Sequence, residues 1–334
     1  MRIEKTVLGK PFADNALYVR LNSGQKIHRF LFDCGEGTCN ELSIGELQKI
    51  DHLFFSHFHL DHIAGFDHFI RANYNRTTKP VHIWGPETTT EIIFHRLNSF
   101  TWNLIDDVPS RWIIHEITPQ KILTTELRAS EAFAQKHPVG VRDFNSTILE
   151  TADYRLSIRF LEHRIKVLGF KLQEKGRLNI SKAALIRNSL PEGHYLEKLK
   201  DPKVDDDQQL KVGDQIFTVG HLRKLLLEKQ PGECLAYLTD FIFQESRLKE
   251  WADWLNGCDE LVCESQYLSN DRELAGENFH LTTDQAAKLA KQAKVKSLTL
   301  IHFSRRYQNE KPDLFLEEAN KIFPRSHLPE TWNS

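Results

Sequence analysis

The sequence lacks the features of secreted and membrane proteins. It has five cysteines in 334 residues, an odd number without a CxxC pair, so we expect free or buried thiols in a reducing cytosol and no disulfides. No stretch approaches the roughly 20 apolar residues of a membrane span, and the N-terminus lacks the apolar core of a signal peptide. We therefore expect a cytoplasmic protein that does not enter a membrane.

An excess of one charge is also missing. There are 44 basic and 46 acidic residues, giving a formal net charge of −2, so no global field draws the chain onto nucleic acid. Any polyanion must be bound by a local basic patch. The remaining composition, 40% hydrophobic and 27% charged, is that of a globular protein with enough apolar residues for a large core.

Short apolar runs of strand character each end at a residue able to do chemistry. The residues that follow these runs are Asp33, His57, Asp240, Glu264 and His302. Helical stretches lie between the runs, and the clearest begins at Thr282, where Gln285 has the spacing of a capping box. Strands that alternate with helices predict an α/β layered fold.

The segment 172–210 differs from the rest of the chain. It has no strand-like run, it is interrupted by glycine and proline, and it contains a short helical stretch around 180–187. We interpret it as a protruding insertion within one domain that spans residues 1–334.

Four potential metal ligands lie within six residues, directly after a strand: His57, His59, Asp61 and His62. If the chain leaves the strand extended, the first two histidines point the same way. A turn then brings Asp61 and His62 to a second metal nearby. Imidazole and carboxylate without thiolate suit Zn²⁺, or Mn²⁺ or another divalent ion. The alternative is a histidine-rich loop without metal, which the intact HxHxDH spacing disfavours.

This HxHxDH motif resembles the signature of the metallo-β-lactamase superfamily. The resemblance implies a four-layer αββα sandwich with the metals at one edge of the central sheets, here with an exosite-like arm. Iron-binding redox members of the superfamily usually have Glu at the position of His59. Histidine at that position favours a hydrolase.

Further segments, in the same order along residues 28–307, are similar to ribonuclease Z, the endonuclease that trims the 3′ end of precursor tRNA. They are the stretch from Asp33 to Thr38 (DCGEGT), Glu162 to Phe170, Tyr237 to Asp240, Glu264 with His280 to Thr282, and His302 to Tyr307. The sequence departs from the family after Gly65, at Phe241 and around Pro191.

The resemblance implies a role for each candidate ligand. One Zn²⁺ would be held by His57, His59 and His163, the other by Asp61, His62 and His302, and Asp240 would bridge both. A water shared by the two ions loses its proton near neutral pH, and the hydroxide attacks phosphorus in line. Asp33 is expected to orient a histidine N–H from outside the ligand set.

The resemblance also implies the catalytic residues, which are His280, Glu264 and Asp61. His280 would be the general acid toward the leaving 3′ oxygen, polarised by Glu264. The alternative is that His280 only flanks the helix after it. His137 competes with His163 as the third ligand, and His52 and His68 are interpreted as structural.

Basic residues near the insertion could bind RNA phosphates. Lys175, Arg177, Lys182 and Arg187 form a possible RNA exosite, because an arm at this place in ribonuclease Z grips tRNA. The alternative is a solvated helix face. Arg305 and Arg306, beside His302, would bind a substrate phosphate.

The sequence therefore predicts a zinc-dependent phosphodiesterase that cleaves the 3′ trailer from tRNA precursors. The resemblance alone implies a homodimer. One alternative is the same metal site acting on another phosphodiester, such as a small nucleotide. Another is a thioesterase, lactonase or β-lactamase, and a non-enzymatic RNA-binding module is the least favoured.

Overall fold

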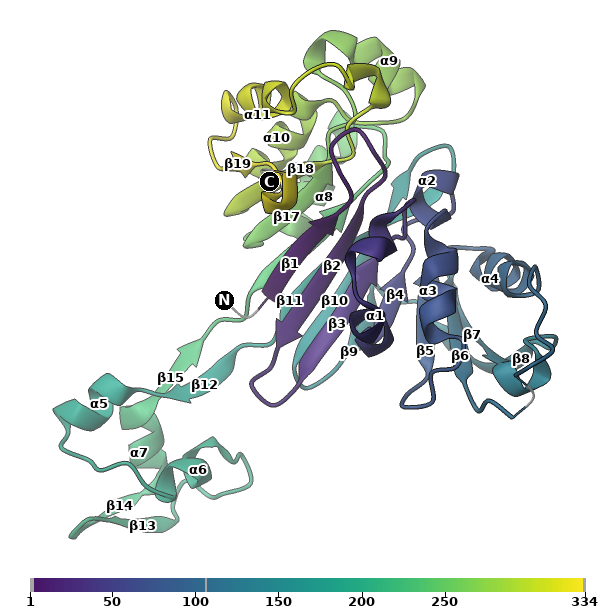
Figure 1. Cartoon of the computed structure of the whole chain (residues 1–334). Helices are drawn as coiled ribbons and strands as arrows, with labels where there is room; N and C mark the ends of the chain where they lie inside the picture. The colour runs from purple at the N-terminus through teal and green to yellow at the C-terminus, as the bar shows by residue number, and fades with distance from the viewer. Residues whose placement is uncertain (1–2, 106, 333–334) are drawn as a thin grey trace. The chain divides into compact units, whose positions relative to one another are not determined.

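The computed structural model describes residues 3–105 and 107–332 (Figure 1). The chain divides into two compact units. The main unit comprises the residues up to Gln173 and from Cys234 onward, and the inserted unit comprises Glu174–Glu233. Within the described ranges, no helix has the length and apolar character needed to cross a bilayer.

Two mixed sheets form the main unit. The first has strands in chain order: β1 (Ile3–Leu8), β2 (Ala16–Asn22), β3 (Ile27–Phe32), β4 (His52–Phe54), β5 (Val81–Gly85), β6 (Arg111–Ile117), β7 (Lys121–Arg128) and β8 (His137–Asp143). The second has the order β19 (Ser326–His327), β18 (Ser297–Ile301), β17 (Glu260–Glu264), β16 (Cys234–Leu238), β11 (Lys166–Glu174), β10 (Tyr154–Glu162) and β9 (Thr147–Glu150). Strands β3 to β6 are parallel, as are β16 to β19.

Helices accompany each sheet. The first half contains α1 (Ile44–Lys49), α2 (Leu60–Ile63), α3 (Phe66–Asn73) and α4 (Thr89–Leu97), and the second contains α8 (Leu248–Leu255), α9 (Arg272–Glu277), α10 (Thr283–Gln292) and α11 (Asp313–Asn320). Short 3-10 turns are η1 (Thr38–Glu41), η2 (Ala129–Glu131), η3 (Glu245–Arg247), η4 (Ser269–Asp271), η5 (Arg305–Tyr307) and η6 (Glu330–Trp332).

Alternating side chains of the strands reach different cores. In β2, Leu17 and Val19 enter the core between the sheets, whereas Tyr18 packs with Leu47 of α1 and Phe69 of α3. The second sheet also has two buried faces. One face contributes to the core between the sheets, and the other packs on residues of α8, α10 and α11. A strand whose two faces are both buried needs a layer on each side. The main unit is therefore an α/β/β/α sandwich, as predicted.

The local signals in the sequence are largely confirmed. Thr282 caps α10, and its capping box with Gln285 is complete. After α10, Lys294 takes a left-handed conformation (φ 54°), and strand β18 begins at Ser297. All five cysteines are buried and free.

The inserted unit has its own small core. Strand β12 (Arg177–Ile180) pairs with β15 (Leu227–Gln230), and β13 (Gln209–Val212) pairs with β14 (Gln215–Thr218). Helices α5 (Lys182–Arg187), α6 (Tyr195–Lys200) and α7 (Val219–Leu226) surround a cluster that includes Leu185, Leu199, Leu222 and Leu226. The predicted helix around 180–187 is α5. The expectation that 172–210 has no strand was wrong, because β11 extends to Glu174, β12 lies within the segment and β13 begins at Gln209. Strand β12 was missed because it is short and its partner lies outside the segment.

Candidate metal centre

The candidate residues follow the carboxyl ends of strands from both sheets. Asp33 follows β3, Asp240 comes two residues after β16, and His302 follows β18. All three have left-handed backbones, with φ of 60°, 50° and 60°. A non-glycine residue in this region costs roughly 1 kcal/mol, and such outliers concentrate at functional sites. The sharp turn after each strand directs the side chain into one buried centre.

Two motif loops pack backbone against backbone. The amide of Cys34 donates to the carbonyl of His62 at 2.8 Å, and the amide of Gly65 donates to the carbonyl of Cys34 at 2.8 Å. A Cβ at Gly65 would lie 2.2 Å from the carbonyl oxygen of Gly35. Only glycine permits this approach, which explains why the DCGEG stretch and the metal motif occur together.

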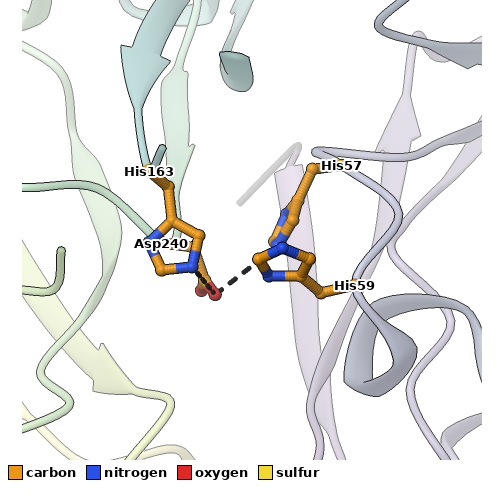
Figure 2. Close-up of side chains that lie close together, drawn as sticks. All are labelled: His57, His59, His163 and Asp240. Carbon is orange, nitrogen blue, oxygen red and sulfur yellow. Dashed lines mark ion pairs between the residues drawn. The ribbon is translucent and has the colours of Figure 1, made fainter. Parts of the chain in front are cut away.

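The first group of donors is His57, His59, His163 and Asp240, whose candidate ligand atoms all lie within 4.8 Å of one another. In Figure 2, the side chains of His163 and Asp240 come from one half of the unit and face His57 and His59. The Oδ2 atom of Asp240 is 3.6 Å from His57 Nε2 and 3.8 Å from His163 Nε2.

The second group is Asp61, His62, His302 and again Asp240. His62 Nε2 lies 3.4 Å from Asp240 Oδ2 and 3.6 Å from Asp61 Oδ2. His302 Nε2 lies 3.3 Å from Asp61 Oδ2 and 3.5 Å from Asp240 Oδ1. Asp240 is therefore shared by the two groups and presents a different oxygen to His302.

The donor atoms fit divalent cations. Among the described residues, the Nε2 atoms of His57 and His62 are buried without a hydrogen-bond partner, and buried polar atoms rarely stay unpaired. Burial and repulsion by His62 hold the pKa of His57 well below its usual value, so the ring is neutral, the form that binds metal. Burial alone would raise the pKa of Asp240, but His302 and His62 hold it well below its usual value. Imidazole rings around an ionised carboxylate form a donor set that suits a metal such as Zn²⁺.

A third group adds Glu264 and His280 to Asp240 and His302. His280 Nδ1 is 2.8 Å from Glu264 Oε2, and Glu264 Oε1 accepts a hydrogen bond from the amide of Phe241 at 2.7 Å. Burial would lower the pKa of His280, but Glu264 and Asp240 raise it above its usual value. Glu264 thus holds both the His280 ring and the loop that carries Asp240.

Comparisons with known proteins identify the family. Residues 28–177 match the model described as the beta-lactamase superfamily domain. The chain is 38% identical to ribonuclease Z of Deinococcus radiodurans over 330 residues, which cover 99% of this chain and 98% of that protein. It is 28% identical to ribonuclease Z of Picosynechococcus sp. over 94% of this chain and 88% of that protein. The chain belongs to the ribonuclease Z family.

Solved structures agree on the fold. The metallo-β-lactamase fold protein YhfI from Bacillus subtilis has a TM-score of 0.58 at 15% identity, covering 98% of this chain and 95% of that one. The short form of human tRNase Z has a TM-score of 0.53 at 18% identity, covering 92% and 94%. The predicted metallo-β-lactamase fold is thereby confirmed.

The other histidines considered in the sequence lie apart from the three donor groups. His137 begins β8 and pairs with Glu131 at 2.5 Å, so the structure places His163, not His137, with the ribonuclease Z motif residues. His52 accepts a hydrogen bond from Trp84 Nε1 at 3.1 Å within the first sheet, and His68 lies on α3.

The predicted phosphate-binding arginines have acidic partners. Arg305 Nη2 is 3.0 Å from Asp14 Oδ1, and Arg306 Nη1 is 3.7 Å from Asp271 Oδ1. Their side chains remain 70% and 43% exposed. Both can therefore reach solvent from the turn that follows His302.

Several contacts of the centre were missed in the sequence. His163 Nδ1 donates to the carbonyl of Phe279 at 2.8 Å. The side-chain amide nitrogen of Gln266 (Nε2) lies 3.3 Å from His302 Nδ1. Ser56 Oγ lies 3.0 Å from His57 Nδ1. Any residue can supply a backbone carbonyl, so the sequence gives no sign of the Phe279 contact. Ser56 lies two residues after β4 and directly before the metal motif, where the sequence could have drawn attention to it.

Proposed function

We propose that this protein is a metal-dependent endoribonuclease that removes the 3′ trailer from precursor tRNA. The observation that carries the proposal is the pair of donor groups that share Asp240, with the His280–Glu264 pair beside them. Relatives named ribonuclease Z that match nearly the whole chain support the same activity. The chemistry is assigned to the main unit, which contains all of these residues.

The proposed cofactors are two Zn²⁺ ions, with Mn²⁺ as an alternative. His57, His59 and His163 would hold one ion, Asp61, His62 and His302 the other, and Asp240 both. When bound, the ions would activate a water and stabilise charge on the phosphoryl oxygens. The chain orients the His163 ligand in advance. Its Nδ1–H donates to the Phe279 carbonyl, and its Nε2 faces Asp240.

His280 is proposed as the general acid that protonates the leaving 3′ oxygen. Its Nδ1 is bound to Glu264, so its Nε2 is the atom available to substrate. Glu264 is completely buried and cannot leave this contact without losing its partners. Asp61 would act both as ligand and as a catalytic residue, since its carboxylate lies between His62 and His302.

The inserted unit is proposed as the RNA exosite. Lys182 and Arg187 are exposed on α5, while Arg177 is partly buried and pairs with Glu174. The unit carries eleven basic and ten acidic residues, so binding must come from a local basic surface that also includes Lys175. Arg305 and Arg306 would hold a phosphate near the metal centre.

A homodimer in the cytoplasm is also proposed. The five buried free cysteines are compatible with a reducing compartment, and the dimer is what the resemblance to ribonuclease Z implies. Analytical ultracentrifugation tests the dimer, and a monomer at micromolar concentration would contradict it.

The activity is tested with three measurements on the same protein. Metal content is measured by plasma emission, and hydrolysis is followed on 3′-extended pre-tRNA and on bis(p-nitrophenyl) phosphate. We expect about two metal equivalents and tRNA products that end in a 3′ hydroxyl. Hydrolysis of the small phosphodiester without any cleavage of pre-tRNA would overturn the proposal.

A further inference from the structure

Asp33 is a buried carboxylate that accepts hydrogen bonds from both halves of the main unit. Its Oδ1 accepts from the Ser56 amide at 2.7 Å, and its Oδ2 accepts from His62 Nδ1 at 3.0 Å and from the Tyr237 hydroxyl at 2.9 Å. The Ser56 hydroxyl lies 3.0 and 2.8 Å from the two oxygens. A buried charge is tolerated only when it is paired in this way.

The direction of these hydrogen bonds determines where His57 carries its proton. An ionised carboxylate can only accept, so the single hydroxyl proton of Ser56 must point to Asp33. The Ser56 oxygen is then an acceptor for His57 Nδ1–H, 3.0 Å away. The Nε2 atom of His57 is left without a proton and faces Asp240 Oδ2 at 3.6 Å.

The same carboxylate orients the ring of His62 directly. Because His62 Nδ1 donates to Asp33, the ring is turned so that its Nε2 faces Asp240 Oδ2 at 3.4 Å. His57 belongs to the first donor group and His62 to the second. One carboxylate therefore orients one histidine of each group, through Ser56 in the first case and without an intermediary in the second.

Tyr237 connects this arrangement to the other sheet. It lies in β16, three residues before Asp240, and its hydroxyl reaches Asp33 across 204 positions of sequence. Its ring is 2% exposed and lies 5.8 Å from that of Phe32, which directly precedes Asp33. The hydrogen bond thus relates the histidines of the first sheet to the carboxylate of the second that they share.

We propose that Ser56 and Tyr237 are positioning residues that, through Asp33, hold the rings of His57 and His62 in the orientation that metal binding requires. The proposal rests on the ligand roles proposed above. It assigns a role in the reaction to two side chains that touch neither substrate nor metal.

The test uses Tyr237→Phe and Ser56→Ala in the full chain, each of which removes one hydroxyl. Tyr154→Phe and Ser265→Ala are the matched controls. Tyr154 is buried in the same core between the sheets, and Ser265 is a buried serine whose hydroxyl has no hydrogen-bond partner in the described chain. Dissociation constants for Zn²⁺ alone are measured by competition with a chromogenic chelator, and histidine ring ¹⁵N spectra report the proton on Nδ1.

We expect each network variant to bind Zn²⁺ about 10- to 100-fold more weakly, the usual effect of losing a partner behind a metal ligand. The kcat for pre-tRNA should fall while KM changes little. In Ser56→Ala the Nδ1–H signal of His57 should shift or disappear. The controls should match the parent chain in all three measurements.

Parental Zn²⁺ affinity, kcat and ring spectra in both network variants would overturn the proposal. Equal losses in the controls would also overturn it, because they would show a general effect of altering the core. A failure of the proposed function looks different, since the parent chain itself would then bind no Zn²⁺ or leave pre-tRNA uncut.

Discussion

The main unit and the inserted unit hold their polar side chains in opposite ways. In the main unit, buried groups are paired across long distances in sequence, as Asp33 is with Tyr237 and His302 with Asp61. In the inserted unit, charged residues are mostly exposed and their pairs span fewer positions, 3 for Arg177 with Glu174 and 17 for Arg223 with Asp206. Reacting groups need a preorganised site, whereas phosphate contacts tolerate loosely held charges. The contrast agrees with the proposal that the main unit carries out the chemistry and the inserted unit captures the substrate.

The largest effect is expected from removing Asp240. Asp240→Ala should abolish hydrolysis of every substrate and most metal binding, because both donor groups lose a member. His59→Ala should empty the first group in the same way. Plasma emission and both hydrolysis assays measure the outcome, with His137→Ala as a control outside the donor groups. Undiminished metal in Asp240→Ala and His59→Ala would contradict the ligand assignment.

The next effect separates proton transfer from metal binding. His280→Ala should keep its metals and lose roughly 10² to 10⁴ in rate on RNA, the range for a general acid. The loss should be smaller on bis(p-nitrophenyl) phosphate, because nitrophenolate leaves without needing a proton. Equal losses on both substrates would remove His280 from this role.

Deleting the inserted unit should distinguish capture from chemistry. Gln173 and Cys234 are paired residues of the antiparallel strands β11 and β16, so an Asn-Gly turn can replace residues 174–233 and close a hairpin. A cut over 172–210 would instead remove Leu172 from the core between the sheets. The deleted chain should hydrolyse bis(p-nitrophenyl) phosphate at nearly the parental rate and bind pre-tRNA far more weakly. Parental binding of pre-tRNA would leave the unit without a role in capture.

A finer test replaces only charges within the inserted unit. Changing Lys175, Arg177, Lys182 and Arg187 to Ala should weaken pre-tRNA binding. The slope of the logarithm of the binding constant against the logarithm of the salt concentration should become shallower by about 0.7 to 0.9 per lost phosphate contact. The control changes four exposed basic residues elsewhere in the unit, which are Lys200, Lys203, Lys211 and Lys224. If both sets of substitutions weaken pre-tRNA binding equally, the proposed exosite is not confined to the first four residues. If neither set changes binding, the basic run is a solvated surface.

The smallest expected effect concerns the stability of the main unit in acid. His52, His82 and His115 lie side by side on β4, β5 and β6. Burial lowers the pKa of His82 to about 4, and burial with the charge of His82 lowers that of His115 to about 2. A histidine in the unfolded chain titrates near 6.5. As pH falls from about 6.5 to about 4, these histidines therefore bind protons in the unfolded chain but stay neutral in the folded chain. The free energy of unfolding should decline over that window.

Urea unfolding in the presence of a chelator measures this decline. His82→Gln should flatten the dependence by up to one proton, because glutamine cannot take up a proton. The chain without the inserted unit should keep the parental dependence, since all three histidines lie in the main unit. A pH dependence unchanged by His82→Gln would contradict the assignment.

Sequence and structure agree best where a pattern is local. The capping box at Thr282 depends on residues a few positions apart, and it forms as predicted. The HxHxDH spacing is equally local, and its histidine and aspartate side chains lie in the candidate donor groups. Contacts between residues far apart in the chain were harder to predict from the sequence. Strand β12 was not predicted because its partner β15 lies about fifty residues later in the sequence. The Phe279 carbonyl that orients His163 escaped because every residue has such a group.

The donor groups draw on both sheets, with His57 and His62 from the first and Asp240 and His302 from the second. Neither half of the main unit can assemble a complete group alone. A bound metal would therefore fasten the two sheets together and add its binding free energy to their cohesion. The resistance of the chain to heat and proteolysis should then rise with free metal concentration, so the availability of the ion would govern how long the enzyme survives as well as how fast it works.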